Sequence, residues 1–216
     1  MNKLYEKYFD ELINLNPSIN DYLGIEKYSH LKNLYENTIH PEHIKKSKEF
    51  YKKYLKLINK KEKLNHYDKV LKLSLKINLD YYNYNFDYLP LDHENNPIAF
   101  FCESSSGKLY YTFKTHSDYY KFIEKTKYFS EYILTCIENM KIGIKKKIVL
   151  PKILAKKLLD QIKDIIKKKP YKNHNVPKNL KVDFNKEIEN ILDKTLKKLV
   201  KFLTETYIPK CRNTYG

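Results

Sequence analysis

The run His93-Glu94-Asn95-Asn96-Pro97 begins like the zinc-peptidase motif H-E-x-x-H. That motif binds zinc because two histidines one helical turn apart reach the same ion, while the glutamate lies beside a metal-bound water. Here Pro97 stands at the position of the second histidine, so one ligand is missing. We expect this run to be a loop without a zinc site.

Two other runs contain residue types that do chemistry. The run His40 to His43 places two imidazoles and a carboxylate at an expected helix start. No third metal ligand follows at a suitable spacing, so we interpret these as surface capping residues. The run Ser104 to Lys108 contains S-G-K but lacks the G-x-x-x-x-G-K-[ST] frame of a phosphate-binding loop. We therefore predict no catalytic, metal-binding or cofactor-binding residue, and no cofactor.

The net charge of +16, from 42 Lys and Arg against 26 Asp and Glu, suggests a polyanionic partner such as nucleic acid. Only Arg212 is an arginine, whereas base and phosphate recognition favours the forked guanidinium group. Lysine and tyrosine are abundant together, as AT-rich codons would produce, so genome composition explains the charge without a ligand. A giant DNA virus, a protozoan or an AT-rich bacterium would fit as the source of such a composition. We favour solvated lysine faces and keep nucleic-acid binding as an alternative.

The hydrophobic pattern is helical almost everywhere and predicts an all-α fold, with about six amphipathic helices in one domain over 1–216. The third helix carries Val70, Leu73, Ile77 and Tyr81 in one register. The expected helices span about 4–15, 41–58, 66–83, 117–140, 151–165 and 183–209.

The period changes after Pro97, where two short aromatic or β-branched runs flank a Ser-Gly segment. This pattern predicts a short β-hairpin near 98–113. Ser117 then fits the N-cap of a long helix, which we expect Gly143 to end.

No apolar run approaches the roughly 18 residues of a membrane span, and the charged N-terminus lacks the pattern of a signal peptide. Cys102, Cys136 and Cys211 are an odd number without a C-x-x-C pair, which suits a reducing compartment. We expect an intracellular, cytoplasmic protein, or one of the host cytoplasm or virion if the source is a virus.

Six segments follow one another in the order of a known family's landmarks. Asn16 to Gly24, which includes Pro17, is similar to D-P-x-x-A-T-x-x-G, and Leu64 to Asp68 to the start of L-S-x-x-D-R-x-D-Y. Leu89 to Leu91 is similar to L-P-x-x-Q, and Ser117 to Tyr119 to T-V-x-D-Y. Ile137 to Ile144, with Gly143, Val149 and Pro151, resembles L-x-x-G-I-x-x-G-x-x-P. Leu203 to Gly216, with Tyr207, Pro209 and Arg212, resembles F-L-x-x-E-Y-x-P-x-x-R-x-T-x-G.

On these segments the chain resembles the N-terminal part of the domain-of-unknown-function 885 family, helical proteins regarded as gluzincin-type zinc metallopeptidases. Three of the four glycines and the only arginine lie on the landmarks. The chain departs from them at Lys145 to Lys147, which replace a glycine, and over 93–113, which matches poorly.

The resemblance implies that the H-E-x-x-x-G-H-type zinc motif lies beyond the last landmark, where this chain ends at Gly216. No residue here would then inherit a catalytic role, and the landmark residues would be structural. We expect a non-catalytic remnant acting as a helical interaction or scaffold domain. The alternatives are one half of a split zinc metallopeptidase, completed by a separate zinc-module chain, and a basic nucleic-acid-binding protein.

Overall fold

The computed structural model describes residues 3–92, 94 and 96–214, which fold into eight α-helices joined by turns and short 3₁₀ and π segments. No strand forms in this part of the chain, apart from one isolated bridge between Pro151 and Arg212. The all-α prediction is confirmed. The helices are α1 (Lys3–Leu15), α2 (Ile19–Leu23), α3 (Pro41–Asn59), α4 (His66–Tyr81), α5 (Pro97–Ser105), α6 (His116–Lys146), α7 (Lys152–Lys168) and α8 (Phe184–Phe202).

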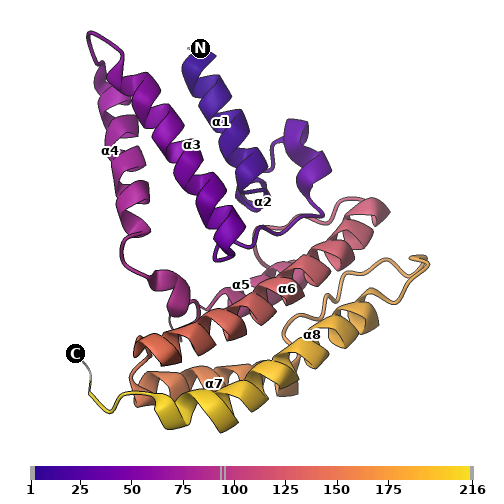
Figure 1. Cartoon of the computed structure of the whole chain (residues 1–216). Helices are drawn as coiled ribbons and strands as arrows, with labels where there is room; N and C mark the ends of the chain where they lie inside the picture. Colours follow the sequence, from indigo (N-terminus) through magenta and orange to yellow (C-terminus); the bar gives the residue numbers. More distant parts are fainter. Residues whose placement is uncertain (1–2, 93, 95, 215–216) are drawn as a thin grey trace.

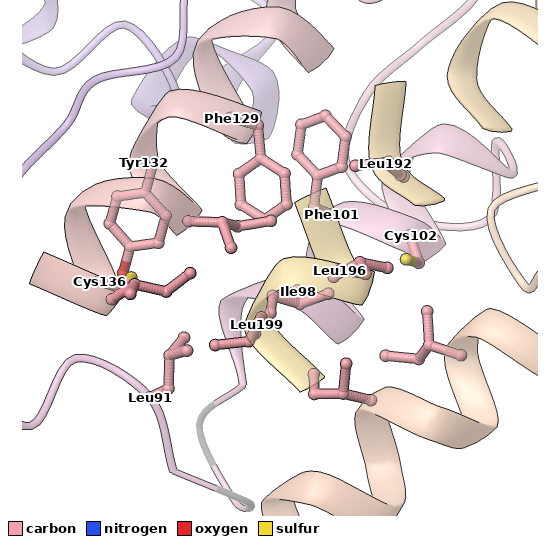
Figure 2. Close-up of a cluster of buried hydrophobic side chains, with 14 of the residues drawn as sticks. Leu91, Ile98, Phe101, Cys102, Phe129, Tyr132, Cys136, Leu192, Leu196 and Leu199 are labelled. Carbon is pink, nitrogen blue, oxygen red and sulfur yellow. The ribbon is translucent and has the colours of Figure 1, made fainter. Parts of the chain in front are cut away.

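The helices form two groups (Figure 1). In the lower group, α8 packs along the long helix α6, and α5 and α7 complete the layer. The larger hydrophobic core lies here, where Phe101 of α5 stacks on Phe129 of α6 with ring centroids 3.9 Å apart. Figure 2 shows these two rings beside Leu192 and Leu196 of α8.

The upper group contains α1, α3 and α4, with α4 at its outer edge (Figure 1). Its core is smaller and centres on Tyr54 and Ile58 of α3 and Leu75 of α4, all fully buried. The apolar stripe of α1, formed by Leu4, Tyr8, Leu12 and Leu15, packs against this core. Helix α3 contacts both of its neighbours, and a hydrogen bond from Tyr5 of α1 to Asp68 of α4 joins those two directly.

The segment from α2 to the start of α3 connects the two groups along α6. Asn37 donates from Nδ2 to Oγ1 of Thr135 at 2.7 Å, and Asn139 donates to the carbonyl of Ile39 at 3.0 Å. These bonds give partners to the Nδ2 groups of Asn37 and Asn139, whereas Oδ1 of Asn37 is buried without a partner in the described part of the chain.

The predicted β-hairpin near 98–113 is wrong, because its first half is the helix α5. Asn96 caps this helix by accepting from the backbone N–H of Ile98 at 3.0 Å, and Pro97 occupies the first helical position. Ile98, Phe101 and Cys102 are buried on one face, so the run has the helical period. A short aromatic run does not reveal the helical period by itself, and the run was therefore wrongly predicted to be a strand.

Two boundaries of α6 also differ from the prediction. The N-cap is Thr115 and not Ser117; the backbone N–H and the hydroxyl of Thr115 both donate to the carboxylate of Asp118. The helix runs through Gly143 to Lys146 and ends where Lys147 adopts a left-handed φ of 61°. Gly143 serves close packing, since a Cβ there would lie 2.6 Å from the carbonyl oxygen of Ile148.

Candidate interaction surface

Helix α4 has apolar residues on two opposite faces. The inner face packs Leu75, with Leu71 and Leu79 beside it, into the upper core. The outer face carries Val70 and Ile77, which are 54% and 59% exposed. A helix that borders a single core needs only one apolar face, so the outer one calls for an explanation.

The start of α4 fixes which face turns outward. Asn65 and Asp68 form a capping box, with bonds of 2.9 and 3.2 Å between their side chains and backbone N–H groups. Tyr5 of α1 donates to Asp68 at 2.6 Å, and Lys61 forms an ion pair with the same carboxylate. These hydrogen bonds hold the pKa of Asp68 below its ordinary value. Asp68 therefore anchors the inner face of α4 against α1.

The outer face forms a continuous stripe, which we call the α4 stripe. It consists of Val70, Leu73, Ile77 and Tyr81. Beyond the helix, the ring of Phe86 lies 5.1 Å from that of Tyr81 and 5.8 Å from that of Tyr84, and we include these two residues in the stripe. Their side chains are between 45% and 66% exposed. The sequence predicted this register of four residues, but the structure turns it to solvent and puts the neighbouring leucines into the core.

Lysines border the α4 stripe on one side. Lys69, Lys72 and Lys76 recur at helical spacing between the stripe and the inner face, with Asp80 near the end of the same border. None of the three lysines forms an ion pair within the described part of the chain. The opposite border carries the uncharged Ser74 and Asn78. The stripe is thus apolar in its centre and positive along one edge.

The histidines that the structure describes are not gathered into a group that could hold a metal ion. No group of three or more His, Cys, Asp or Glu side chains within the described ranges is arranged to hold a metal ion. His40 caps α3 by accepting from the N–H of Glu42 at 3.3 Å, as predicted. Burial lowers the pKa of the nearby His43. His93 and Asn95 lie outside the described residues, and Pro97 begins α5.

Several landmark residues meet where the end of the chain passes the α6–α7 connection. The hydroxyl of the fully buried Tyr207 accepts from the backbone N–H of Leu150 at 2.9 Å. Arg212 donates from Nε to the carbonyl of Val149 at 3.3 Å, and its own carbonyl accepts from Lys152 at 2.8 Å. These contacts tie the C-terminal segment to the α6–α7 connection and the start of α7.

The remaining landmarks lie at both ends of the chain. Pro17 is buried before α2, and Gly24 ends that helix in a left-handed conformation with a φ of 62°. Pro209 lies in a 3₁₀ turn, and Gly216 lies outside the described residues.

The sequence did not predict that one apolar face of α4 turns to solvent, because both faces of this helix are apolar.

The fold and this surface together define an all-α domain with one helix face left apolar and exposed. Residues 17–216 match the model of a family described as "Bacterial protein of unknown function (DUF885)". The chain belongs to this family, as its landmark segments suggested. No curated protein matches the chain, and no helix in the described part is long and apolar enough to cross a membrane.

Proposed function

We propose that this chain is a non-catalytic helical interaction domain, which binds an acidic amphipathic helix of another protein along the α4 stripe. The observation that carries the proposal is the exposure of Leu73 and Ile77, which are 60% and 59% exposed in the middle of a regular helix. Large apolar patches on soluble proteins mark interaction sites, because exposing them to water costs free energy.

The size and shape of the stripe fit one helix. From Val70 to Tyr81 it extends over roughly 17 Å of helix axis. With Tyr84 and Phe86 it offers on the order of 700 Å² of exposed surface, close to the area that one partner buries in a small specific interface. A helix docks on such a stripe through residues spaced three and four apart.

The charge of the border determines the chemistry of the partner. Three lysines without an ion pair in the described structure follow one edge of the stripe, so glutamates or aspartates along the docking helix would form ion pairs with them. A second copy of this chain would instead bring its own lysines, and a net charge of +16, to the same seam. Because like charges across an interface are unfavourable, we favour a different, acidic partner.

The direct test titrates the protein with a synthetic acidic helix that has a leucine seam flanked by glutamates. We expect saturable one-to-one binding by calorimetry, and at least tenfold weaker binding for the same peptide with lysines in place of the glutamates. Ile77→Asp should reduce the affinity at least tenfold. Ile153→Asp, a matched change at a 44% exposed position of α7, should leave it unchanged.

Three results would overturn the proposal. One is equal binding of the two peptides, or equal effects of the two variants. Another is a dimer of the unliganded protein that Ile77→Asp dissociates, which would assign the stripe to a second copy. The third is flotation with phosphatidylserine vesicles that depends on Ile77, which would assign it to an anionic membrane.

A second candidate is one half of a split zinc metallopeptidase, in which the docking partner is a chain with an H-E-x-x-x-G-H-type motif. The exposed stripe supports this candidate as well, because a half-enzyme leaves its contact face bare when it is alone. Purification of the native assembly distinguishes the two. A co-purifying chain with one zinc per complex and peptidase activity supports the split enzyme, whereas a partner without zinc supports the interaction domain.

A further inference from the structure

A cavity of about 230 Å³ lies between the α2 region and the layer formed by α5 and α6. Its charged groups are the carboxylates of Asp21 and Glu36 and the ammonium group of Lys125. Its aromatic lining includes Tyr22 and Tyr110. We call it the α2–α5 pocket; its lining residues are not part of the α4 stripe.

Local structure holds the polar groups of this pocket in place. The buried side chain of Asn20 bonds to both the N–H and the carbonyl of Ile25, at 3.0 and 3.1 Å, which fixes the end of α2. Gly24 turns the chain there with its left-handed backbone. Asp21 and Tyr22 are thereby positioned at the pocket from one side.

Lys125 is 2% exposed, and its charge is already compensated. Its ammonium group lies 2.8 Å from the carboxylate of Asp21 and donates to the carbonyl of Leu34 at 2.7 Å. A buried ammonium group needs such partners, since an unpaired one would be strongly destabilised. Burial also raises the pKa of Asp21, even though Lys125 favours its ionised form.

Glu36 differs from Asp21, because its carboxylate is bonded to the backbone and forms no ion pair among the described residues. Its Oε2 accepts from the backbone N–H of Ser18 at 3.0 Å. No lysine, arginine or histidine within the described ranges forms an ion pair with it. The pocket therefore carries one uncompensated negative charge, although the chain as a whole has a net charge of +16.

Aromatic rings stand exposed at this pocket. Tyr22 and Tyr110 have ring centroids 3.9 Å apart and are 61% and 45% exposed, and Phe100 is 47% exposed. Aromatic faces attract organic cations through the ring quadrupole, especially beside a carboxylate. Aromatic carbon does not coordinate metal ions, so these walls favour an organic cation over a metal ion.

We propose that the α2–α5 pocket binds a small organic cation, an alkylammonium or alkylguanidinium group, with Glu36 as its counter-ion and the rings of Tyr22, Tyr110 and Phe100 as its walls. The cavity is smaller than most pockets for drug-sized ligands, so the ligand carries only a few carbon atoms beside its charged group. This binding is independent of partner docking on α4.

The test is a titration with butylguanidinium, followed by amide chemical shifts in the NMR spectrum. We expect saturable shifts confined to the amides around Ser18, Glu36 and Ser104, and at least tenfold weaker binding of pentanamide, a neutral molecule of similar size. Glu36→Gln keeps an acceptor for the N–H of Ser18 and should weaken butylguanidinium binding at least tenfold. Glu62→Gln makes the same charge change at an exposed site and should not.

Tyr110→Leu provides a second variant that does not touch the charged groups, and it should weaken binding severalfold through the lost ring. Amide shifts spread over the lysine-rich surface, equal binding of pentanamide, or full affinity in Glu36→Gln would each overturn the proposal.

Discussion

Leu75 and Ile77 lie two residues apart on α4 but face opposite directions, and this offers a matched test of the outer apolar face. Leu75 is fully buried against α3, whereas Ile77 is 59% exposed. Truncation of each to alanine removes a similar volume of hydrocarbon from the same helix. Only one of the two truncations should leave a cavity.

Leu75→Ala should lower the free energy of unfolding by about 3 kcal/mol, within the usual range of about 2–5 kcal/mol for buried leucines. Ile77→Ala should change it by less than about 0.5 kcal/mol, since alanine favours the helix and little contact is lost. Urea unfolding followed by circular dichroism measures both changes.

For a slope of roughly 2–3 kcal/mol per molar urea, the Leu75→Ala midpoint should fall by about 1 M, while that of Ile77→Ala stays near wild type. Affinity for the acidic peptide should show the opposite order of effects. Ile77→Ala should bind the peptide more weakly than wild type, whereas Leu75→Ala should not. Equal destabilisation by both truncations of the free protein would refute the orientation of α4 on which the proposed function rests.

Three further predictions concern the lower group. Gly143→Ala should destabilise the protein by about 1–3 kcal/mol in thermal unfolding, because its Cβ would lie 2.6 Å from the carbonyl of Ile148; wild-type stability would contradict the close approach. Tyr207→Phe should cost about 1–2 kcal/mol in urea unfolding, since it leaves the buried N–H of Leu150 without its acceptor; a neutral effect would argue against this bond. Asp118 has a lowered pKa, because bonds from a lysine and two backbone N–H groups outweigh the opposing effect of burial. The stabilisation by ionised Asp118 is present above the ordinary aspartate pKa of about 4 and is lost as the pH falls through its lower pKa in the folded protein. Asp118→Asn should therefore flatten the decline of stability in acid, and an unchanged decline would contradict this.

The long helices could be predicted from the sequence because each has a periodic apolar stripe, although the expected ends of α6 at Ser117 and Gly143 were wrong. Pro41 opens α3 as expected, and the turn before His66 separates α3 from α4. Helix α5 was missed because nine residues rich in aromatic side chains do not distinguish a helix from a strand. Helix α2 was missed because five residues show no period.

The orientation of α4 could not be predicted, since a helix with two apolar faces has no unique inner side. The bonds that fix the orientation of α4 come from Tyr5, which is distant in the sequence, and from Lys61, which lies in the preceding turn. The α2–α5 pocket was not foreseen for a similar reason. Asp21, Glu36 and Lys125 belong to separate segments that only the tertiary fold brings together.

The most direct test of the interaction domain is the footprint of the acidic helical peptide on methyl-labelled protein. The account predicts that the methyl signals of Val70, Leu73 and Ile77 shift and saturate together, while those of the buried Leu75 change little. Shifts elsewhere with none on these three side chains, or no saturable shift at all, would contradict the claim that α4 is the docking surface.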